Sequence, residues 1–378
     1  MPKILIVSLS RILEDPRVLR QQEALRVENH LVIGGYPPFP ENSIAIELFP
    51  VPSKVSLMAC GILSLMGFHA VTEKILFQVK RNSLELVRGI PHVDMIIVND
   101  ITSMPYVIEY RKQTGQPDVP VYLDLHEYSP MEGSSPSCKL IKNRLKKYLC
   151  KKYIHEADIL STVSSGIKVL YEKMAKCEVY VIPNAPKFID ITPTTVDSEK
   201  IELVYHGGFG PGRDIHGMVE AIRLLGKPYE MHFYLVGGEQ DKMKIEEASE
   251  GLRVFFHDPV SPDKIPETIA KHDIGVHLLK SDNLNNKYAL PNKLFEYLQA
   301  RLAIVSSPNE EMGDFIKSNR IGVVAAKCDA QHLAAAIKSV TVSDIIEYKK
   351  NSNKAAAEFC AEKYFPITKK LVRMGLST

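Results

Sequence analysis

The sequence is poor in the features that mark disulfide-stabilised, metal-binding and nucleic-acid-binding proteins. Its six cysteines form no CxxC pair and no Cys/His metal spacing, which is typical of free thiols in a reducing compartment. It contains 47 basic and 45 acidic residues, so the net charge of +2 gives no reason to expect a nucleic-acid partner. No Asp-x-Asp motif occurs, so a metal-bridged phosphate site of that kind has no visible ligands. We expect no metal and no cofactor.

Long hydrophobic runs are also missing. No uncharged apolar run reaches the ~18 residues that a membrane-spanning helix needs. The first ten residues, MPKILIVSLS, contain one lysine and a short apolar run, which predicts a first strand rather than a signal peptide. A composition of 45% hydrophobic and 24% charged residues is that of a soluble globular protein, and 378 residues are enough for two domains. We therefore expect a cytoplasmic protein with two domains.

Short apolar runs alternate with helix-length segments along nearly the whole chain. Ile4–Val7 is continuously apolar, as expected of a strand that is buried on both faces. Asp15-Pro16 then predicts a helix start, because Asp caps free N–H groups and Pro fits the first helical position. Such alternation predicts parallel sheets with crossover helices, and two runs of six or seven strands predict two doubly wound, Rossmann-like α/β domains. The other predicted strands are 31–33, 44–49, 95–98, 119–125, 159–163, 179–182, 203–205, 232–236, 254–257, 274–278, 304–306 and 323–325.

The predicted domain boundary follows residues 181–186, where two prolines precede a polar stretch over 192–200. We expect an N-terminal domain over 1–186 and a C-terminal domain over 187–363, with a ligand in the cleft between them. The last segment, 364–378, is expected to be helical after Pro366 and to pack back on the first domain. The clearest helices before it are predicted over 70–88, 139–156 and 165–176.

One stretch, Tyr288–Ser307, carries the strongest indication of a ligand site. Pro291 predicts a helix start there, and Lys293 and Glu296 lie in the first turns of that helix. The helix follows the predicted strand 274–279, and open α/β sheets bind ligands at the carboxyl ends of their strands. A helix N-terminus and a lysine suit a diphosphate, and a glutamate suits the ribose hydroxyls. The alternative is a solvated helix face.

A glycine-rich loop over Tyr205–Arg213 follows another predicted strand and opens a helix over Ile215–Leu225. Its glycines let backbone N–H groups approach an anion, and Arg213 can bind phosphate oxygens. The loop matches neither the G-x-G-x-x-G motif nor a P-loop. A flexible turn with an exposed arginine is the alternative.

In the first domain, Tyr122–Glu127 ends a strand with His126, which can hydrogen-bond a substrate or a leaving group. Asp124 and Glu127 could orient this histidine or cap the next helix. A structural histidine is the alternative. No G-x-S-x-G elbow supports Ser-His-Asp hydrolysis.

Residues 139–152 carry seven basic side chains, no acid and one apolar stripe. This pattern predicts either a helix that binds an anionic membrane surface or an ordinary surface helix whose stripe faces the core. The uncharged run over 55–68 is consistent with membrane association or with a buried helix. The residues assigned to the acceptor or membrane side are Arg11, Arg17, Lys142, Lys146 and Lys147.

Together these segments resemble glycosyltransferase family 4, whose members are retaining enzymes with the two-domain GT-B fold. The resemblance covers nearly the whole chain, and its pieces occur in the order of the family. They are Asp15-Pro16-Arg17-Val18, Tyr122–Glu127, Thr162-Val163-Ser164, Ile182–Pro186, the glycine loop with Arg213, Val236-Gly237-Gly238 and Leu290–Tyr297.

The resemblance implies transfer of a sugar, with retention, from a nucleoside diphosphate sugar that lies in the second domain, without a metal. A UDP-sugar is favoured over a GDP-sugar, and a lipid-linked glycan of capsule or O-antigen synthesis is the expected acceptor. In the resemblance His126, Arg213, Lys293 and Glu296 are catalytic: His126 contacts the donor sugar, and Glu296 the ribose. The implied donor-binding residues are Gly207, Gly208, Arg213, Tyr288, Ala289, Leu290, Asn292, Lys293 and Glu296.

Two positions depart from the family pattern. Tyr288 replaces the first of two glutamates that the family carries eight positions apart, and Gly208 stands where many members have an arginine. A non-catalytic GT-B scaffold is therefore the main alternative. An epimerase or a phosphorylase of the same fold would need residues or chain length that the sequence does not show.

Overall fold

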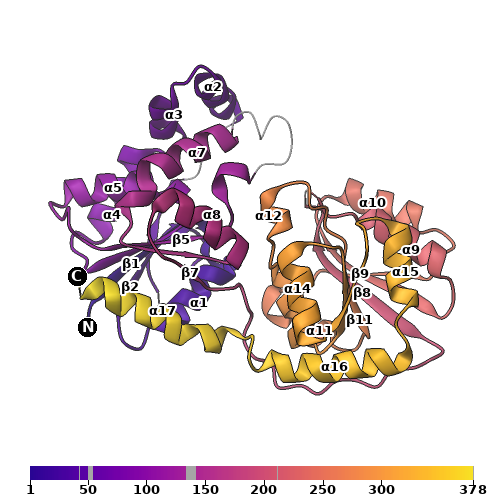
Figure 1. Ribbon diagram of the computed structural model, residues 1–378. Coiled ribbons are helices and arrows are strands. Elements are labelled where there is room, and N and C mark those ends of the chain that lie inside the picture. The colour runs from indigo at the N-terminus through magenta and orange to yellow at the C-terminus, as the bar shows by residue number, and fades with distance from the viewer. Residues whose placement is uncertain (42, 50–53, 133–141, 211, 378) are drawn as a thin grey trace. The chain divides into compact units, whose positions relative to one another are not determined.

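The structure is a computed structural model that describes residues 1–41, 43–49, 54–132, 142–210 and 212–377. The chain forms two compact units (Figure 1). Unit 1 comprises Met1–Pro183 and Tyr364–Thr378, and unit 2 comprises Asn184–Lys363. Each unit is built on one parallel sheet.

Unit 1 contains a seven-stranded sheet in the order β3-β2-β1-β4-β5-β6-β7. The chain first moves outward from β1 to β3 and then returns to the other side of β1, so the switch point lies between β1 and β4. Ligands of doubly wound sheets bind at such switch points. The strands are β1 (Lys3–Arg11), β2 (His30–Tyr36), β3 (Ile44–Glu47), β4 (Met95–Asn99), β5 (Val121–Leu125), β6 (Ile159–Thr162) and β7 (Val179–Val181).

The helices of unit 1 differ from the sequence prediction in two places. The helix expected over 139–156 ends at Tyr153 and is followed by a 3-10 helix over Ile154–Glu156. Asp15 caps the first helix by accepting hydrogen bonds from the amides of Arg17 and Val18, as predicted. The single helix expected over 70–88 is two helices, because Gln78 adopts the left-handed conformation (φ 45°) between them. The α-helices are α1 (Pro16–Leu25), α2 (Lys54–Leu65), α3 (His69–Leu76), α4 (Val79–Gly89), α5 (Met104–Gln113), α7 (Lys142–Tyr153) and α8 (Ser165–Ala175).

The C-terminal helix α17 (Ala361–Leu376) starts before Pro366 and contains that proline in its interior. Leu371 and Val372 of this helix are buried in one apolar cluster with Ile4 of β1 and Val18 of α1. Figure 1 shows α17, in yellow, beside α1. The end of the chain therefore completes the core of unit 1.

Unit 2 contains a six-stranded sheet in the order β10-β9-β8-β11-β12-β13, with its switch point between β8 and β11. The predicted parallel α/β architecture is confirmed in both units. The strands are β8 (Ile201–Gly208), β9 (Tyr229–Val236), β10 (Val254–His257), β11 (Ile274–His277), β12 (Ala303–Ser306) and β13 (Gly322–Val324). The helices are α9 (Ile215–Leu225), α10 (Glu239–Ala248), α11 (Ile265–Ile269), α12 (Leu284–Lys287), α13 (Asn292–Gln299), α14 (Glu310–Asn319), α15 (Ala330–Lys338) and α16 (Val342–Ala356).

Helix α13 lies directly on strand β11. A Cβ at Gly275 would lie 2.4 Å from the Tyr297 ring, so only glycine leaves room for that ring on the strand. The Tyr297 hydroxyl donates a 2.9 Å hydrogen bond to the carbonyl of Val276. This packing fixes where the first turn of α13 presents its side chains. Among the described residues, no helix combines the length and the apolar character needed to cross a membrane.

Candidate functional site

Lys293, in the first turn of α13, packs against the carboxyl end of β8. A Cβ at Gly207 would lie 2.5 Å from Lys293 Nζ, and Gly207 has a φ of +111°, which favours glycine. The Lys293 side chain is only 8% exposed. The lysine therefore lies inside the unit, and the alternative of a solvated helix face does not apply to it.

Burial, followed by the positive charge of Arg213, lowers the pKa of Lys293 to about 8, whereas Glu296 acts in the opposite direction. Arg213 is exposed, and its Nη1 donates a 3.1 Å hydrogen bond to the carbonyl of Gly208. The guanidinium lies over Gly210, where a Cβ would approach Nη1 to 2.7 Å. Among the described residues neither Lys293 nor Arg213 forms an ion pair, although Glu296 lies near enough to act on the lysine, so two cations converge on the end of β8 without a paired carboxylate. Such a place favours an anion.

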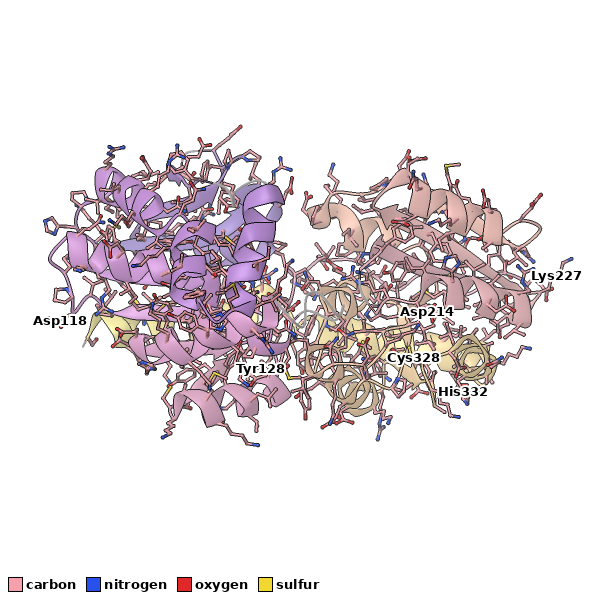
Figure 2. All side chains as sticks on the ribbon, turned by 90° about the horizontal axis from the view of Figure 1, so that it is seen from above. Asp118, Tyr128, Asp214, Lys227, Cys328 and His332 are labelled. Carbon is pink, nitrogen blue, oxygen red and sulfur yellow. The ribbon has the colours of Figure 1, made fainter. Side chains whose placement is uncertain are left out.

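The rest of the glycine loop leads into α9. Asp214, labelled in Figure 2, caps this helix by accepting a 2.8 Å hydrogen bond from the amide of Gly217. The predicted bounds of α9 are confirmed. Pro211 lies outside the described residues.

Glu296 lies one turn further along α13, next to a histidine that the sequence analysis did not assign. His206 Nε2, on β8, is 3.2 Å from Glu296 Oε2, although the pair lacks the alignment of a hydrogen bond. The His206 ring packs edge-on against Tyr297 at 5.3 Å. Burial, followed by the charge of Lys293, lowers the pKa of His206 well below its usual value, so the ring is neutral at pH 7. The neighbouring Gly207-Gly208 was the one signal that could have indicated His206.

A second buried histidine, His277, ends strand β11 at the same edge of the sheet. Its ring stacks on Tyr205 at 6.3 Å, and Lys293 Nζ lies 5.5 Å from the centroid of the Tyr205 ring. Neither His277 nitrogen has a hydrogen-bond partner among the described residues. Burial, with Lys293 and Arg213 nearby, lowers its pKa well below the usual value. In the sequence, His277 is visible only as part of a predicted apolar strand.

The segment between α12 and α13 offers backbone N–H groups, and not charged side chains, to a ligand. Tyr288 ends α12, where its amide donates to the carbonyl of Leu284 at 3.0 Å and the Lys287 ammonium lies 5.0 Å from its ring. Pro291 was predicted to be the first residue of α13, but it is the N-cap residue, and it provides no side-chain cap. The first N–H groups of α13 can therefore bind an anion. Between the two helices Ala289 and Leu290 are half-buried, and α13 itself begins with Asn292, which is exposed.

In unit 1, His126 follows β5 next to the switch point. Its Nε2 donates a 3.3 Å hydrogen bond to Asn99 Oδ1 at the end of β4, which leaves Nδ1 as the nitrogen that can accept from a ligand. Burial, followed by the charge of Arg17, lowers the pKa of His126, so its neutral form dominates at pH 7. Asp124, which could orient His126 or cap the next helix, has a carboxylate that is bound by Arg17, Gln21 and Ser161 instead.

Arg17 and Asp124 form a buried ion pair beneath His126. Arg17 Nε is 3.3 Å from Asp124 Oδ2, and Arg17 Nη1 donates to the carbonyl of Ile182 at 2.8 Å. Gln21 and Ser161 also donate to Asp124, at 2.9 and 2.5 Å. Arg17 is only 4% exposed, so it is not available to a membrane surface, contrary to the prediction. Its contact with an acceptor stays a prediction.

Helix α7 turns its apolar stripe inward. Leu145 and Leu149 are buried, so the described stripe belongs to the core of unit 1 and does not enter a membrane. Lys146 is 15% exposed and forms ion pairs with Asp100, at 3.3 Å, and with Glu132, so it connects α7 to other segments of unit 1. Lys142 and Lys147 are exposed, as is Arg11, which pairs with Glu14. Residues 139–141 lie outside the described residues.

Comparison with known proteins identifies the class to which this fold belongs. Sucrose-phosphate synthase from Thermosynechococcus elongatus has a TM-score of 0.72, 14% identity and 99% coverage of both chains. HepE from Anabaena, in complex with UDP and glucose, has a TM-score of 0.72, 14% identity and 100% coverage of both chains. A TarM mutant from S. aureus, in complex with Fondaparinux, alpha-GlcNAc-glycerol and UDP, has a TM-score of 0.71, 10% identity and 100% coverage of both chains. The predicted GT-B fold is confirmed.

The sequence comparison adds a family match over part of the chain. Residues 200–341 match the family model of Glycosyl transferases group 1, and this range contains Gly207, Arg213, Lys293 and Glu296. The predicted resemblance to glycosyltransferases is thus confirmed for the unit that carries the two cations, whereas family 4 itself stays a prediction. A search of curated proteins found no match.

Proposed function

We propose that the protein transfers a sugar from a nucleoside diphosphate sugar, with UDP as the nucleotide. One observation carries the proposal: the buried Lys293 ammonium and the Arg213 guanidinium converge at the switch point of the sheet in unit 2. A diphosphate supplies the two negative charges that this arrangement lacks. HepE has been crystallised with UDP-glucose and TarM with UDP, on the same fold, which supports the choice of UDP.

The residues of unit 2 account for the leaving group of such a transfer. As the bond from the anomeric carbon to the diphosphate breaks, negative charge grows on the phosphate oxygens, and Lys293 and Arg213 stabilise it. We assign Glu296 the role of accepting hydrogen bonds from the ribose hydroxyls, which its position one turn beyond Lys293 supports. Retention at the anomeric carbon and a contact of His126 with the sugar rest on the family resemblance alone.

A non-catalytic nucleotide-binding scaffold is the second candidate, because Tyr288 replaces a glutamate of the family pattern and Gly208 replaces an arginine. The buried lysine argues against a scaffold that binds no nucleotide. A buried ammonium that forms no ion pair destabilises the folded state, and the binding of an anion offsets this cost. The two candidates therefore differ in transfer activity rather than in binding.

The test is thermal stability of the whole protein against UDP, GDP, CMP and their common sugar conjugates. A ligand at 100 times its dissociation constant should raise the free energy of unfolding by about 2.7 kcal/mol. We expect a shift with UDP that is lost in Lys293→Met. Stabilisation without hydrolysis or transfer of the sugar supports the scaffold, and no shift with any nucleotide contradicts both candidates.

We further propose that unit 1 binds an anionic membrane surface peripherally and takes a lipid-linked glycan acceptor, in the synthesis of a surface polysaccharide. Exposed apolar side chains cluster at the end of α2 and along α3: Ile62, Met66, Phe68, Val71 and Ile75. The basic helix α7 lies beside α3, as Figure 1 shows and as the 5.2 Å contact of the His69 and Tyr148 rings indicates. Exposed apolar groups next to exposed cations suit a lipid interface.

A further inference from the structure

A cluster of histidines and acids lies at the amino ends of the strands in unit 2, away from the glycine loop at their carboxyl ends. Glu202 is near the start of β8, His232 is on the neighbouring β9, and His272 lies two residues before β11 on the other side of β8. His232 Nε2 is 3.5 Å from Glu202 Oε1, and His272 Nδ1 is 3.7 Å from Glu202 Oε2. One ligand atom from each of the three residues lies within 4.8 Å of the others.

The two ring nitrogens that face the carboxylate are buried and have no hydrogen-bond partner among the described residues: His232 Nε2 and His272 Nδ1. Their residues are 7% and 1% exposed, so water does not satisfy them freely. Both distances to Glu202 exceed the usual length of an N–H···O hydrogen bond, which is about 2.7–3.2 Å. Buried polar groups in proteins normally have partners. The two nitrogens and the Glu202 carboxylate therefore need a shared partner other than a hydrogen-bonded proton.

The opposite nitrogen of each ring is held by a second residue. His232 Nδ1 is 2.9 Å from His257 Nε2, and His272 Nε2 is 3.3 Å from the Tyr234 hydroxyl. If these nitrogens donate to His257 and Tyr234, the lone pairs of His232 Nε2 and His272 Nδ1 point toward Glu202. Histidines that bind metals commonly donate their other N–H in this way, which fixes the tautomer and the orientation of the ring.

We propose that Glu202, His232 and His272 form a binding site for one divalent transition-metal ion, with Zn²⁺ as the best-fitting ion. Zn²⁺ takes histidine nitrogen and carboxylate oxygen at roughly 2.0–2.2 Å in tetrahedral geometry, which places neighbouring ligand atoms roughly 3.3–3.5 Å apart. The distances of 3.5 and 3.7 Å, which end on Oε1 and Oε2 of Glu202 respectively, are close to this spacing. With one ligand atom per residue the three atoms lie within 4.8 Å of one another, so a small shift of the side chains brings them onto one ion. Mg²⁺ and Ca²⁺ prefer all-oxygen sites, so two imidazoles favour zinc or a similar ion.

Lys200 is the competitor of the metal. Its Nζ lies 2.6 Å from Glu202 Oε1 and 3.6 Å from Glu230 Oε2, and its side chain is half-exposed. The lysine can therefore move to Glu230 and solvent when a metal binds Glu202. Glu230 also holds Arg253. Metal binding thus exchanges one cation for another on Glu202 and leaves no new carboxylate buried alone.

The position of the site indicates its role. Its three ligands come from β9, β8 and the segment that leads into β11, and these strands are neighbours in the sheet, so the ion would link three adjacent strands. The anion site at Lys293 lies at the carboxyl ends of the same strands and shares none of these three residues. The metal site is therefore independent of the proposed transfer reaction, and the role of the ion is to stabilise unit 2.

The test is titration of the metal-free full-length protein with Co²⁺, whose visible absorption reports tetrahedral nitrogen and oxygen ligands, and with Zn²⁺ by calorimetry. We expect one ion per chain and a rise of the melting temperature. Glu202→Gln and His272→Gln should abolish the Co²⁺ absorption. His332→Gln is the matched control, because His332, labelled in Figure 2, pairs with Asp329 at the start of α15, away from the cluster. Cys177→Ser controls for binding by the exposed thiol.

Two further variants test the site without removing a ligand. His257→Phe keeps the aromatic stacking on Tyr234 and His232 but removes the acceptor of the His232 N–H, and it should weaken binding about 10–100-fold. Lys200→Met should tighten binding, because it removes the competing cation. No tetrahedral Co²⁺ spectrum in the wild-type protein overturns the proposal. Unchanged metal affinity in both Glu202→Gln and His272→Gln also overturns it. If these two variants fail to fold, unchanged metal affinity in both His257→Phe and Lys200→Met overturns it.

Discussion

The Lys293 ammonium occupies the space that a side chain at Gly207 would take, since a Cβ there would lie 2.5 Å from Nζ. Gly207→Ala should therefore displace the lysine from the end of β8 and weaken the binding of UDP by at least tenfold, or about 1.4 kcal/mol at 25 °C. It should also destabilise the fold, because Gly207 has a φ of +111°. Calorimetric titration of UDP measures the affinity.

Gly251→Ala is the matched control for this prediction. Gly251 also has a positive φ, +73°, but a Cβ there would meet nothing within 4 Å. This variant should lose stability from backbone strain, roughly 1–2 kcal/mol, while its affinity for UDP stays that of the wild type. Equal affinities in the two alanine variants would show that contact with Lys293 does not matter.

Lys293→Met should stabilise the protein in the absence of nucleotide. The folded pKa of Lys293 is about 8, below its ordinary value of 10.5, so the unfolded chain binds this proton more tightly than the folded chain. The destabilisation, about 3 kcal/mol, is fully present below pH 8 and is lost as the pH rises toward 10.5. Urea denaturation should thus give Lys293→Met its largest advantage at pH 7, and the advantage should shrink by pH 10.

The exposed Lys350 provides the control, because Lys350→Met should change the free energy of unfolding little at either pH. The same Lys293→Met protein should show no stabilisation by UDP at pH 7. A variant that is less stable than the wild type and still binds UDP would contradict both the buried charge and its proposed ligand.

The proposed ribose contact of Glu296 predicts a coupling between the variant and the ligand. Glu296→Gln should lower the affinity for UDP by about 10–100-fold, the range for a hydrogen bond to a charged group. Its affinity for 2′,3′-dideoxy-UDP should equal that of the wild type, because this ligand lacks the ribose hydroxyls. Calorimetry on both proteins with both ligands measures the coupling. An equal loss with the two ligands would place Glu296 elsewhere than at the ribose.

The strands could be predicted because buried parallel strands consist of continuous apolar runs, which lie between helix-length segments of the sequence. All thirteen strands of the two sheets lie on such runs. The break at Gln78 could not be predicted, because residues 70–88 contain neither glycine nor proline. A single left-handed residue there follows from how α3 and α4 pack, which no local signal records.

The site could be predicted only in part. The types of residue that bind a diphosphate were visible at Arg213 and Lys293, but burial of Lys293 depends on the close approach of α13 to β8. The cluster of Glu202, His232 and His272 was missed because its members are 30 and 40 residues apart. The sheet alone brings them together, and short metal-binding spacings cannot reveal such a site.

The ion pair of Arg17 with Asp124 predicts a structural role for this arginine. Arg17→Met should destabilise unit 1 by about 3–5 kcal/mol, because it leaves the buried carboxylate of Asp124 without its partner. Arg11→Met is the control: Arg11 is exposed and pairs with Glu14 at the surface, so its loss should amount to about 1 kcal/mol or less. Urea denaturation of both variants measures the difference. Similar stabilities would mean that the other donors to Asp124 suffice.

The membrane proposal predicts that the exposed cations of α7 act together. Changing Lys142, Arg144, Lys147 and Lys151 to Gln should release the protein from vesicles of anionic lipid, since each basic residue near such a surface contributes about 1 kcal/mol. Lys146 and Lys152 are left unchanged, because they pair with Asp100 and with Glu73 inside unit 1. Cosedimentation with vesicles measures the bound fraction, and Phe68→Ser should lower it as well.

The control for that experiment removes the same charge from unit 2. Lys244, Lys264, Lys350 and Lys354 are exposed there, and changing all four to Gln alters the net charge equally. If general attraction between a basic protein and anionic lipid were responsible, both quadruple variants would dissociate alike. Because the apolar side chains of α2 and α3 lie beside α7 alone, we expect only the α7 variant to leave the vesicles and the control to remain bound.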